Sequence, residues 1–226
     1  MLYLIAKGVK MGYGIKLEVW GDFALFCRPE LKVERFSYEI MTPSAAKGIL
    51  RSIYWHPGVT WVIDKIVVEN PIQFTNIKRN EVKSKISARK VLSDMEKDKE
   101  MAIYTQNDIA QRSSTLLRDV KYVIEAHFIL SNEISSKDSP EKVYNIALRR
   151  IKKGQCFSQP YLGCREFTAY FGVPPKEYHG FEHNTRNLGL VLYDLDYTNL
   201  ENITPIFFNA LLKDGILDLH NCEVFR

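Results

Sequence analysis

Residues 41–58, MTPSAAKGILRSIYWHPG, carry the clearest helix signal in the sequence. Thr42 can cap a helix at its start, and Pro43 suits the first helical turn. The apolar residues that follow recur at helical spacing and would form one buried stripe: Ala45, Ala46, Ile49, Leu50 and Ile53. Pro57 and Gly58 then end the pattern. The segment therefore predicts an amphipathic helix with one face in the core.

Three extended segments flank this helix in the sequence. Residues 15–26 begin with apolar and polar side chains in strict alternation, which is typical of a half-buried strand. Residues 60–74, TWVIDKIVVENPIQF, are rich in β-branched and aromatic residues and predict a second strand. Residues 116–130 alternate again, and their polar face carries four chemically active side chains: Asp119, Lys121, Glu125 and His127. We expect this third strand to present a polar face to solvent.

A second helix and a further strand complete the pattern. Ser139 and Pro140 can open a helix, and Gly154 can end it. Residues 167–173, FTAYFGV, predict another strand. The order strand, helix, strand, strand, helix, strand is that of an α+β domain of the ferredoxin-like (RRM-like) kind, whose sheet leaves one face free.

The polar stretches suggest how the chain is divided. We expect the ferredoxin-like domain to occupy residues 1–173, with a long polar insert at 78–115. So long an insert is usually functional or disordered. Residues 174–226 would form a small C-terminal antiparallel β-sheet appendage, because LGLVLYDLDY and GILDLHNCEVF are β-rich in pattern.

Composition excludes several classes of protein. The 226 residues carry a net charge of +4, and no apolar stretch approaches the roughly 20 residues of a membrane helix. Four cysteines lie without CxxC spacing, which argues against a zinc knuckle or a redox motif. We therefore expect a reduced, cytoplasmic protein with no metal site and no cofactor.

Basic side chains gather in two runs and one loop. The first run is Lys78, Arg79, Lys83, Lys85, Arg89 and Lys90, and the second is Arg149, Arg150, Lys152 and Lys153. Either run could bind RNA phosphates, or could be an ordinary solvated loop or helix face. Arg165 lies in a loop, residues 155–166, whose aromatic Phe157 and Tyr161 could stack on unpaired bases. A tight structural loop is the alternative.

Five blocks of the sequence, in order, resemble the Dvulg subtype of the CRISPR-associated Cas-five family, found in type I-C systems. They are GDFALFCRPE, KVERFSYEIMTPSAAKGILRSIYWHPG, IKRNEV, LLRDVKYVIEAHF and KKGQCFSQPYLGCREF. The resemblance implies a ferredoxin-like core, binding of the repeat-derived 5′ end of the guide RNA, and a metal-independent endoribonuclease. That enzyme cuts the repeat transcript near the base of its stem-loop, with the neighbouring 2′-hydroxyl as nucleophile.

The resemblance also implies catalytic residues, because the family assigns the cut to a tyrosine, a lysine and a histidine. The tyrosine falls on Tyr54 and the histidine on His127. The lysine has no direct match, so Lys121 on the same strand face is the substitute candidate, followed by His56. Histidine suits proton transfer because its pKa, about 6.5, lies near working pH. Without the resemblance, spacing alone favours a packing role for Tyr54 and a structural hydrogen-bonding role for His127.

The implied partners are CRISPR repeat RNA, the backbone and large subunits of the type I-C interference complex, and double-stranded DNA. Two further hypotheses stay open beside the enzyme. One is a catalytically inactive, structural RNA-binding subunit of the same complex. The other is a general RRM-like RNA binder, which is disfavoured because the sequence lacks the aromatic run typical of that class.

Overall fold

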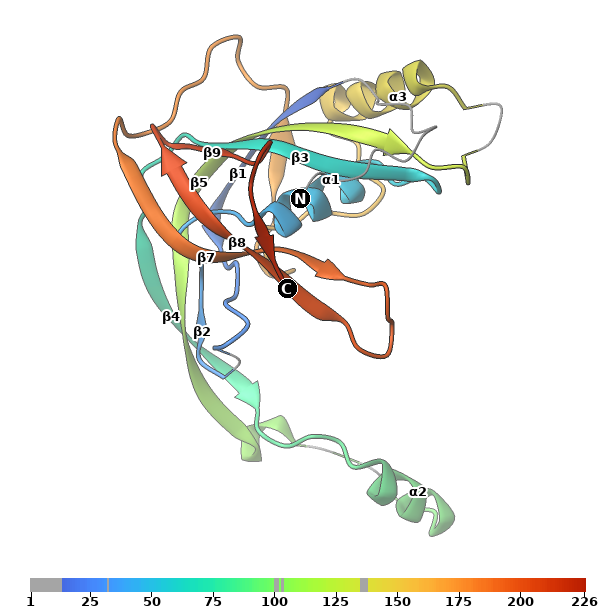
Figure 1. The fold of residues 1–226 in the computed structure, drawn as a ribbon. Coiled ribbons are helices and arrows are strands. Elements are labelled where there is room, and N and C mark those ends of the chain that lie inside the picture. The colour runs from blue at the N-terminus through green and yellow to red at the C-terminus, as the bar shows by residue number, and fades with distance from the viewer. Residues whose placement is uncertain (1–13, 32, 100–101, 103, 135–137) are drawn as a thin grey trace.

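A ten-stranded sheet dominates the computed structural model, which describes residues 14–226 except 32, 100, 101, 103 and 135–137 (Figure 1). Its strands follow the order β10-β8-β9-β3-β5-β1-β6, while β2 and β4 pair with β5 and β7 pairs with β8. The elements are β1 (Ile15–Ala24), β2 (Arg35–Phe36), α1 (Pro43–Ile53), β3 (Val59–Val68), β4 (Phe74–Val82), α2 (Ala88–Glu96), a 3₁₀ turn (Thr105–Asn107), β5 (Ile109–Leu130), α3 (Pro140–Lys153), β6 (Tyr170–Gly172), β7 (Thr185–Asp196), β8 (Thr204–Lys213), β9 (Ile216–Asp218) and β10 (Val224–Phe225).

Four antiparallel strands, β3-β5-β1-β6, form the centre of this sheet. Helix α1 connects β1 to β3, and α3 connects β5 to β6. The two helices touch each other, and they also contact β3 and β1 respectively, so both lie on one face of the sheet. The chain is therefore a mixed α/β protein with a curled antiparallel sheet and few helices (Figure 1).

Both predicted helices form, and their caps are those expected from the sequence. The Thr42 hydroxyl accepts a hydrogen bond from the amide of Ala45 at the start of α1, and Ser139 accepts one from Lys142 at the start of α3. Gly154 ends α3 in the left-handed conformation, with φ of 61°. Most of the predicted α1 stripe is buried under the sheet: Ala46, Ile49, Leu50 and Ile53.

The third predicted strand forms, and its apolar side chains are buried as expected. It is longer than the alternation indicated, because β5 covers 22 residues, Ile109–Leu130. Its first part pairs with β4, and together they make a two-stranded arm with α2 at its far end (Figure 1). The predicted strand 60–74 is in turn two strands, which are separated around Pro71, a residue without a ladder donor.

The segment 78–115 is thus built largely from regular structure. Strand β4 begins before it and runs into it, α2 lies in its middle, and β5 starts before it ends. Sequence patterns missed these strands because the arm has no buried face that would demand apolar residues; none of the residues of β4 is buried.

The C-terminal strands join the core sheet instead of standing alone. Strand β9 pairs with β3, so β7, β8 and β10 continue the same sheet, and β7 also contacts α1. The predicted division of the chain at residue 173 stays a prediction. Within the described residues, no helix is long and apolar enough to cross a membrane.

Candidate functional site

His127 lies on the face of the sheet opposite the helices. Its strand neighbour Phe128 packs edge-on against Trp61 in the core, and successive side chains of a strand point to opposite faces. Asp64 reaches His127 from β3, at the register shift between Ile63 and Lys65. The two oxygens of Asp64 lie 2.8 and 3.0 Å from Nδ1 of His127. A carboxylate at Nδ1 fixes the proton there and leaves Nε2 for another partner.

A second imidazole, that of His220, approaches the same carboxylate from the turn just after strand β9. Nε2 of His220 lies 3.9 Å from Asp64, and its Nδ1 lies 2.6 Å from Asp218. This hydrogen bond from His220 is the main cause that lowers the pKa of Asp218 below its usual range. Sequence reasoning missed Asp64 and His220, because only the pairing of β3 with β5 and β9 brings them to His127.

Lys121 shares the strand face of His127 but lies away from it. His127 lies six positions after Lys121 along the extended strand, which is about 20 Å at 3.3–3.4 Å per residue. Its ammonium group pairs with Glu18 at 2.9 Å and Glu69 at 3.5 Å. The hydrogen bond to Glu18 raises the pKa of Lys121, so the group stays charged and engaged. The structure does not bring Lys121 to His127.

Tyr54 lies on the helix side of the sheet, directly after α1. Its side chain is 5% exposed, and its carbonyl accepts a hydrogen bond from the buried indole of Trp61. The Arg150 guanidinium sits over its ring at 5.2 Å, and the ring of His56 stacks at 6.3 Å. Burial raises the pKa of the Tyr54 hydroxyl, which therefore stays protonated. Tyr54 and His127 thus lie on opposite faces of the sheet.

His56 gives the helix side an imidazole of its own. Its Nδ1 lies 2.6 Å from the carbonyl oxygen of Pro57, and its Nε2 lies 3.5 Å from Asp138. The described residues thus offer two clusters of side chains that include a proton-transfer group. One, on the face opposite the helices (the open face), consists of His127, Asp64 and His220. The other, on the helix side, consists of Tyr54, His56 and Arg150. Within the described chain, no group of three or more His, Cys, Asp or Glu is arranged to hold a metal ion.

The predicted RNA-binding residues fall in three separate places. Lys78, Lys83, Lys85 and Arg89 are exposed on the arm; Arg149, Lys152 and Lys153 are exposed near the end of α3; Arg165 is exposed in the loop before β6. Two predicted residues make protein contacts instead. Arg79 pairs with Glu166 and hydrogen-bonds Ser114, while Arg150 donates to the carbonyl of Ile53 at 2.7 Å.

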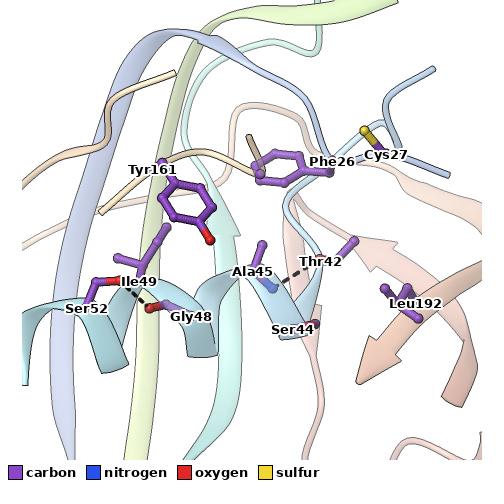
Figure 2. Close-up of a pocket in the computed structure, with 11 residues that line it drawn as sticks. Phe26, Cys27, Thr42, Ser44, Ala45, Gly48, Ile49, Ser52, Tyr161 and Leu192 are labelled. Atoms are coloured by element: carbon purple, nitrogen blue, oxygen red, sulfur yellow. Dashed lines mark hydrogen bonds between the residues drawn. The ribbon is translucent and has the colours of Figure 1, made fainter. Parts of the chain in front are cut away.

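A pocket of about 280 Å³ runs along the outer side of α1 (Figure 2). Tyr161 of the predicted loop reaches over it, opposite small polar residues of the helix such as Ser44 and Ser52. Cys27 lies at its rim, with its sulfur 3.9 Å from that of Cys164. The hydrogen bond between these thiols lowers the pKa of Cys27 to about 7 and raises that of Cys164.

The family described as "CRISPR-associated protein (Cas_Cas5)", in its Cas5d subtype, matches residues 14–219. This chain belongs to the Cas5d family. The family predicted from the five sequence blocks is therefore confirmed.

Two curated relatives of this Cas5d chain carry the name "CRISPR pre-crRNA endoribonuclease Cas5d". The protein of Mannheimia succiniciproducens is 44% identical over 218 residues, which cover 92% of this chain and 96% of the relative. The protein of Thermus thermophilus is 34% identical over 222 residues, which cover 91% of this chain and 90% of the relative.

A solved structure called "Crystal Structure of CRISPR-associated Protein" shares the fold of this Cas5d chain. It superposes with a TM-score of 0.69 at 21% identity, over 96% of this chain and 99% of its own.

Proposed function

We propose that this Cas5d protein cleaves precursor CRISPR RNA (pre-crRNA) within its repeats and then keeps hold of the 5′ end of the guide. The observation that carries the proposal is the 44% identity, over nearly the whole length of both chains, to a protein named as a pre-crRNA endoribonuclease. Tyr54 and His127 match the family's tyrosine and histidine, whereas its lysine has no direct match in the chain.

The proposed reaction needs no group beyond the protein's side chains. The 2′-oxygen attacks the adjacent phosphorus, the bond from phosphorus to the 5′-oxygen breaks, and a 2′,3′-cyclic phosphate and a 5′-hydroxyl result. One side chain must take the proton of the 2′-hydroxyl and one must protonate the leaving oxygen. We assign one of these two proton transfers to Nε2 of His127. Asp64 holds the ring in place through the opposite ring nitrogen, Nδ1.

Tyr54 and Lys121 enter the proposal as separate candidates. A protonated Tyr54 could donate a hydrogen bond to phosphate, but only to RNA on the helix side. Lys121 could bind phosphate along the open face only if RNA displaced Glu18 and Glu69. In this arrangement neither Tyr54 nor Lys121 reaches the reacting RNA atoms that His127 would contact.

Incubation with the cognate repeat RNA in EDTA tests the function directly. We expect two products, one ending in a 2′,3′-cyclic phosphate and the other beginning with a 5′-hydroxyl, because the 2′-oxygen is the nucleophile. Gel mobility before and after phosphatase and kinase treatment identifies these ends. Tight binding of the RNA without any cleavage would favour the alternative, a catalytically inactive, structural RNA-binding subunit.

We also propose that the β3-β5-β1-β6 unit with α1 and α3 is a ferredoxin-like domain. The order strand, helix, strand, strand, helix, strand is met if the β4 arm is set aside. Both helices cover one face, and the partly exposed His127 lies on the opposite face, where we expect RNA to reach it.

Binding of RNA to the arm should be visible in the salt dependence of affinity. Replacing Lys83, Lys85 and Arg89 with alanine removes three exposed charges near the tip of the arm. Each single-strand phosphate contact contributes about 0.7 to the slope of log affinity against log salt, so we expect the slope to fall by about 2. Filter binding at salt concentrations from about 50 to 200 mM measures it, and Lys213→Ala on β8 is the matched control. An unchanged slope would mean that these three arm residues are simply solvated and do not contact RNA phosphates.

Membership in an interference complex is the last part of the proposal. We infer that the protein contacts the backbone and large subunits of a type I-C complex, and that duplex DNA is a further ligand. The family match supports the complex. Co-purification of the subunits with guide RNA tests the first point, and competition between duplex DNA and repeat RNA tests the second.

A further inference from the structure

Trp55 and Phe157 form an exposed aromatic pair on the helix side of the protein. Their ring centroids lie 6.1 Å apart with the planes tilted by 31°, and their side chains are 48% and 68% exposed. Trp55 follows α1, whereas Phe157 follows α3, so two distant parts of the chain build the pair. We call these two side chains the aromatic platform.

Backbone contacts, not burial, hold the platform in place. The amides of Phe157 and Ser158 both donate to the carbonyl of Ser52, at 2.8 and 3.0 Å. Arg150 also ties α3 to the end of α1 through its hydrogen bond to Ile53. The backbone segments that carry the two rings are therefore held together, while much of the ring surface is exposed to water. Such rings can stack on a nucleobase without a large cost in conformational entropy.

Exposed cations lie close in sequence to both members of the platform. Arg51 lies in the last turn of α1, and Arg149, Lys152 and Lys153 lie near the end of α3, just before the loop of Phe157. These four residues are exposed, and none forms an ion pair with any carboxylate in the part of the chain described. Free cations beside exposed rings are the combination by which proteins hold single-stranded nucleic acid.

We propose that the aromatic platform stacks on an unpaired base of single-stranded RNA, while Arg51, Lys152 and Lys153 bind the flanking phosphates. The inference rests on the proposed function and adds to it a base-binding subsite. Tyr54 precedes Trp55 directly, so the bound segment would run along the helix side, past Tyr54 and His56. The RNA would therefore contact the helix side of the protein in addition to the open face that holds His127.

A second exposed aromatic pair has acidic neighbours, and this difference in charge is why we assign RNA binding to the aromatic platform instead. Trp20 of β1 and Tyr170 of β6 are also exposed, at 38% and 54%, with centroids 6.2 Å apart. Acidic residues line the hollow beside Trp20: Glu18, Asp22 and Asp119. The one lysine there, Lys121, already pairs with Glu18. Phosphate would be repelled from this pair, which makes it a matched control for the platform.

The test uses the full chain and its cognate repeat RNA, in which single unpaired purines are replaced in turn by 2-aminopurine. Stacking quenches the fluorescence of this base. We expect quenching at one position with the parent protein, and its loss in Trp55→Ala and Phe157→Ala. The affinity for the RNA should fall about 5- to 150-fold for each lost stacking contact. Trp55→Phe should restore most of both signals, because it keeps an aromatic face.

Three outcomes separate the possibilities. Unchanged affinity and quenching in both variants, with cleavage intact in the parent, would overturn the platform and leave the proposed function standing. Equal losses in the control Trp20→Ala/Tyr170→Ala would overturn it as well, because charge would then play no part. If the parent protein neither bound nor cleaved repeat RNA, the proposed function itself would fail, and the platform with it. Circular dichroism verifies that each variant is folded.

Discussion

His127→Ala is expected to slow cleavage of repeat RNA by about 10²-fold or more while leaving RNA affinity nearly unchanged, because it removes a proton-transfer group and no phosphate contact. Single-turnover cleavage at saturating protein measures the chemical step, and filter binding measures affinity. Asp64→Asn keeps the shape of the partner but removes its charge and favours the wrong tautomer of His127, so it should slow cleavage as well.

Lys121→Ala is the control for this prediction. Lys121 lies about 20 Å from His127 along β5 and is paired with two glutamates, so its loss should leave the rate close to that of the parent. The opposite pattern would be equally informative. If Tyr54→Phe abolished cleavage and His127→Ala cut normally, the reacting phosphate would lie on the helix side, and His56 would be the candidate imidazole.

Gly163→Ala is expected to destabilise the protein by at least about 3 kcal/mol, which lowers the melting temperature of a chain of this size by roughly 6–12 °C. Gly163 has φ of +83°, a conformation that costs any other residue energy. An added Cβ would also lie 2.1 Å from the carbonyl oxygen of Leu25, at the place where the two backbones meet. Thermal unfolding followed by circular dichroism measures the loss.

Gly48→Ala provides the matched control, since Gly48 lines the same pocket but has no atom within 4 Å of an added Cβ. Gly48 lies inside α1, where alanine is favoured over glycine by about 1 kcal/mol, so this variant should melt about 2–4 °C higher than the parent. Equal melting temperatures for Gly163→Ala and the parent would show that the close backbone contact is not maintained in solution.

Local signals made the helices and the core strands predictable. Caps at Thr42 and Ser139 mark helix starts by chemistry that needs no tertiary contact, and alternation marks each strand that buries one face. The arm escaped prediction because its strands bury little, so their residues carry no apolar pattern. The pairing of β9 with β3 could not be predicted, because the sequence of neither segment indicates which strand it pairs with.

The candidate site divides in the same way. The resemblance to a family supplied Tyr54 and His127, yet it could not say that they lie on opposite faces, because that depends on how α1 packs on β3. The contact of Asp64 with His127 depends on the irregular register of β3 and β5. The contact between Trp55 and Phe157 depends on the packing of two helix ends against each other, so it cannot be predicted from sequence spacing.

The pairing of β1 with β5 also sets the timing of folding during synthesis. Ile15 pairs with Ala126, so β1 must wait for roughly a hundred further residues before its main partner is made. At 5–20 residues per second, that delay is on the order of 5–20 s. During it, the apolar side of β1 has no strand to join, and non-local pairing of this kind folds slowly. Nascent chains that stall before residue 109 should therefore bind chaperones or aggregate, whereas chains released past residue 130 can pair β5 with both β1 and β3.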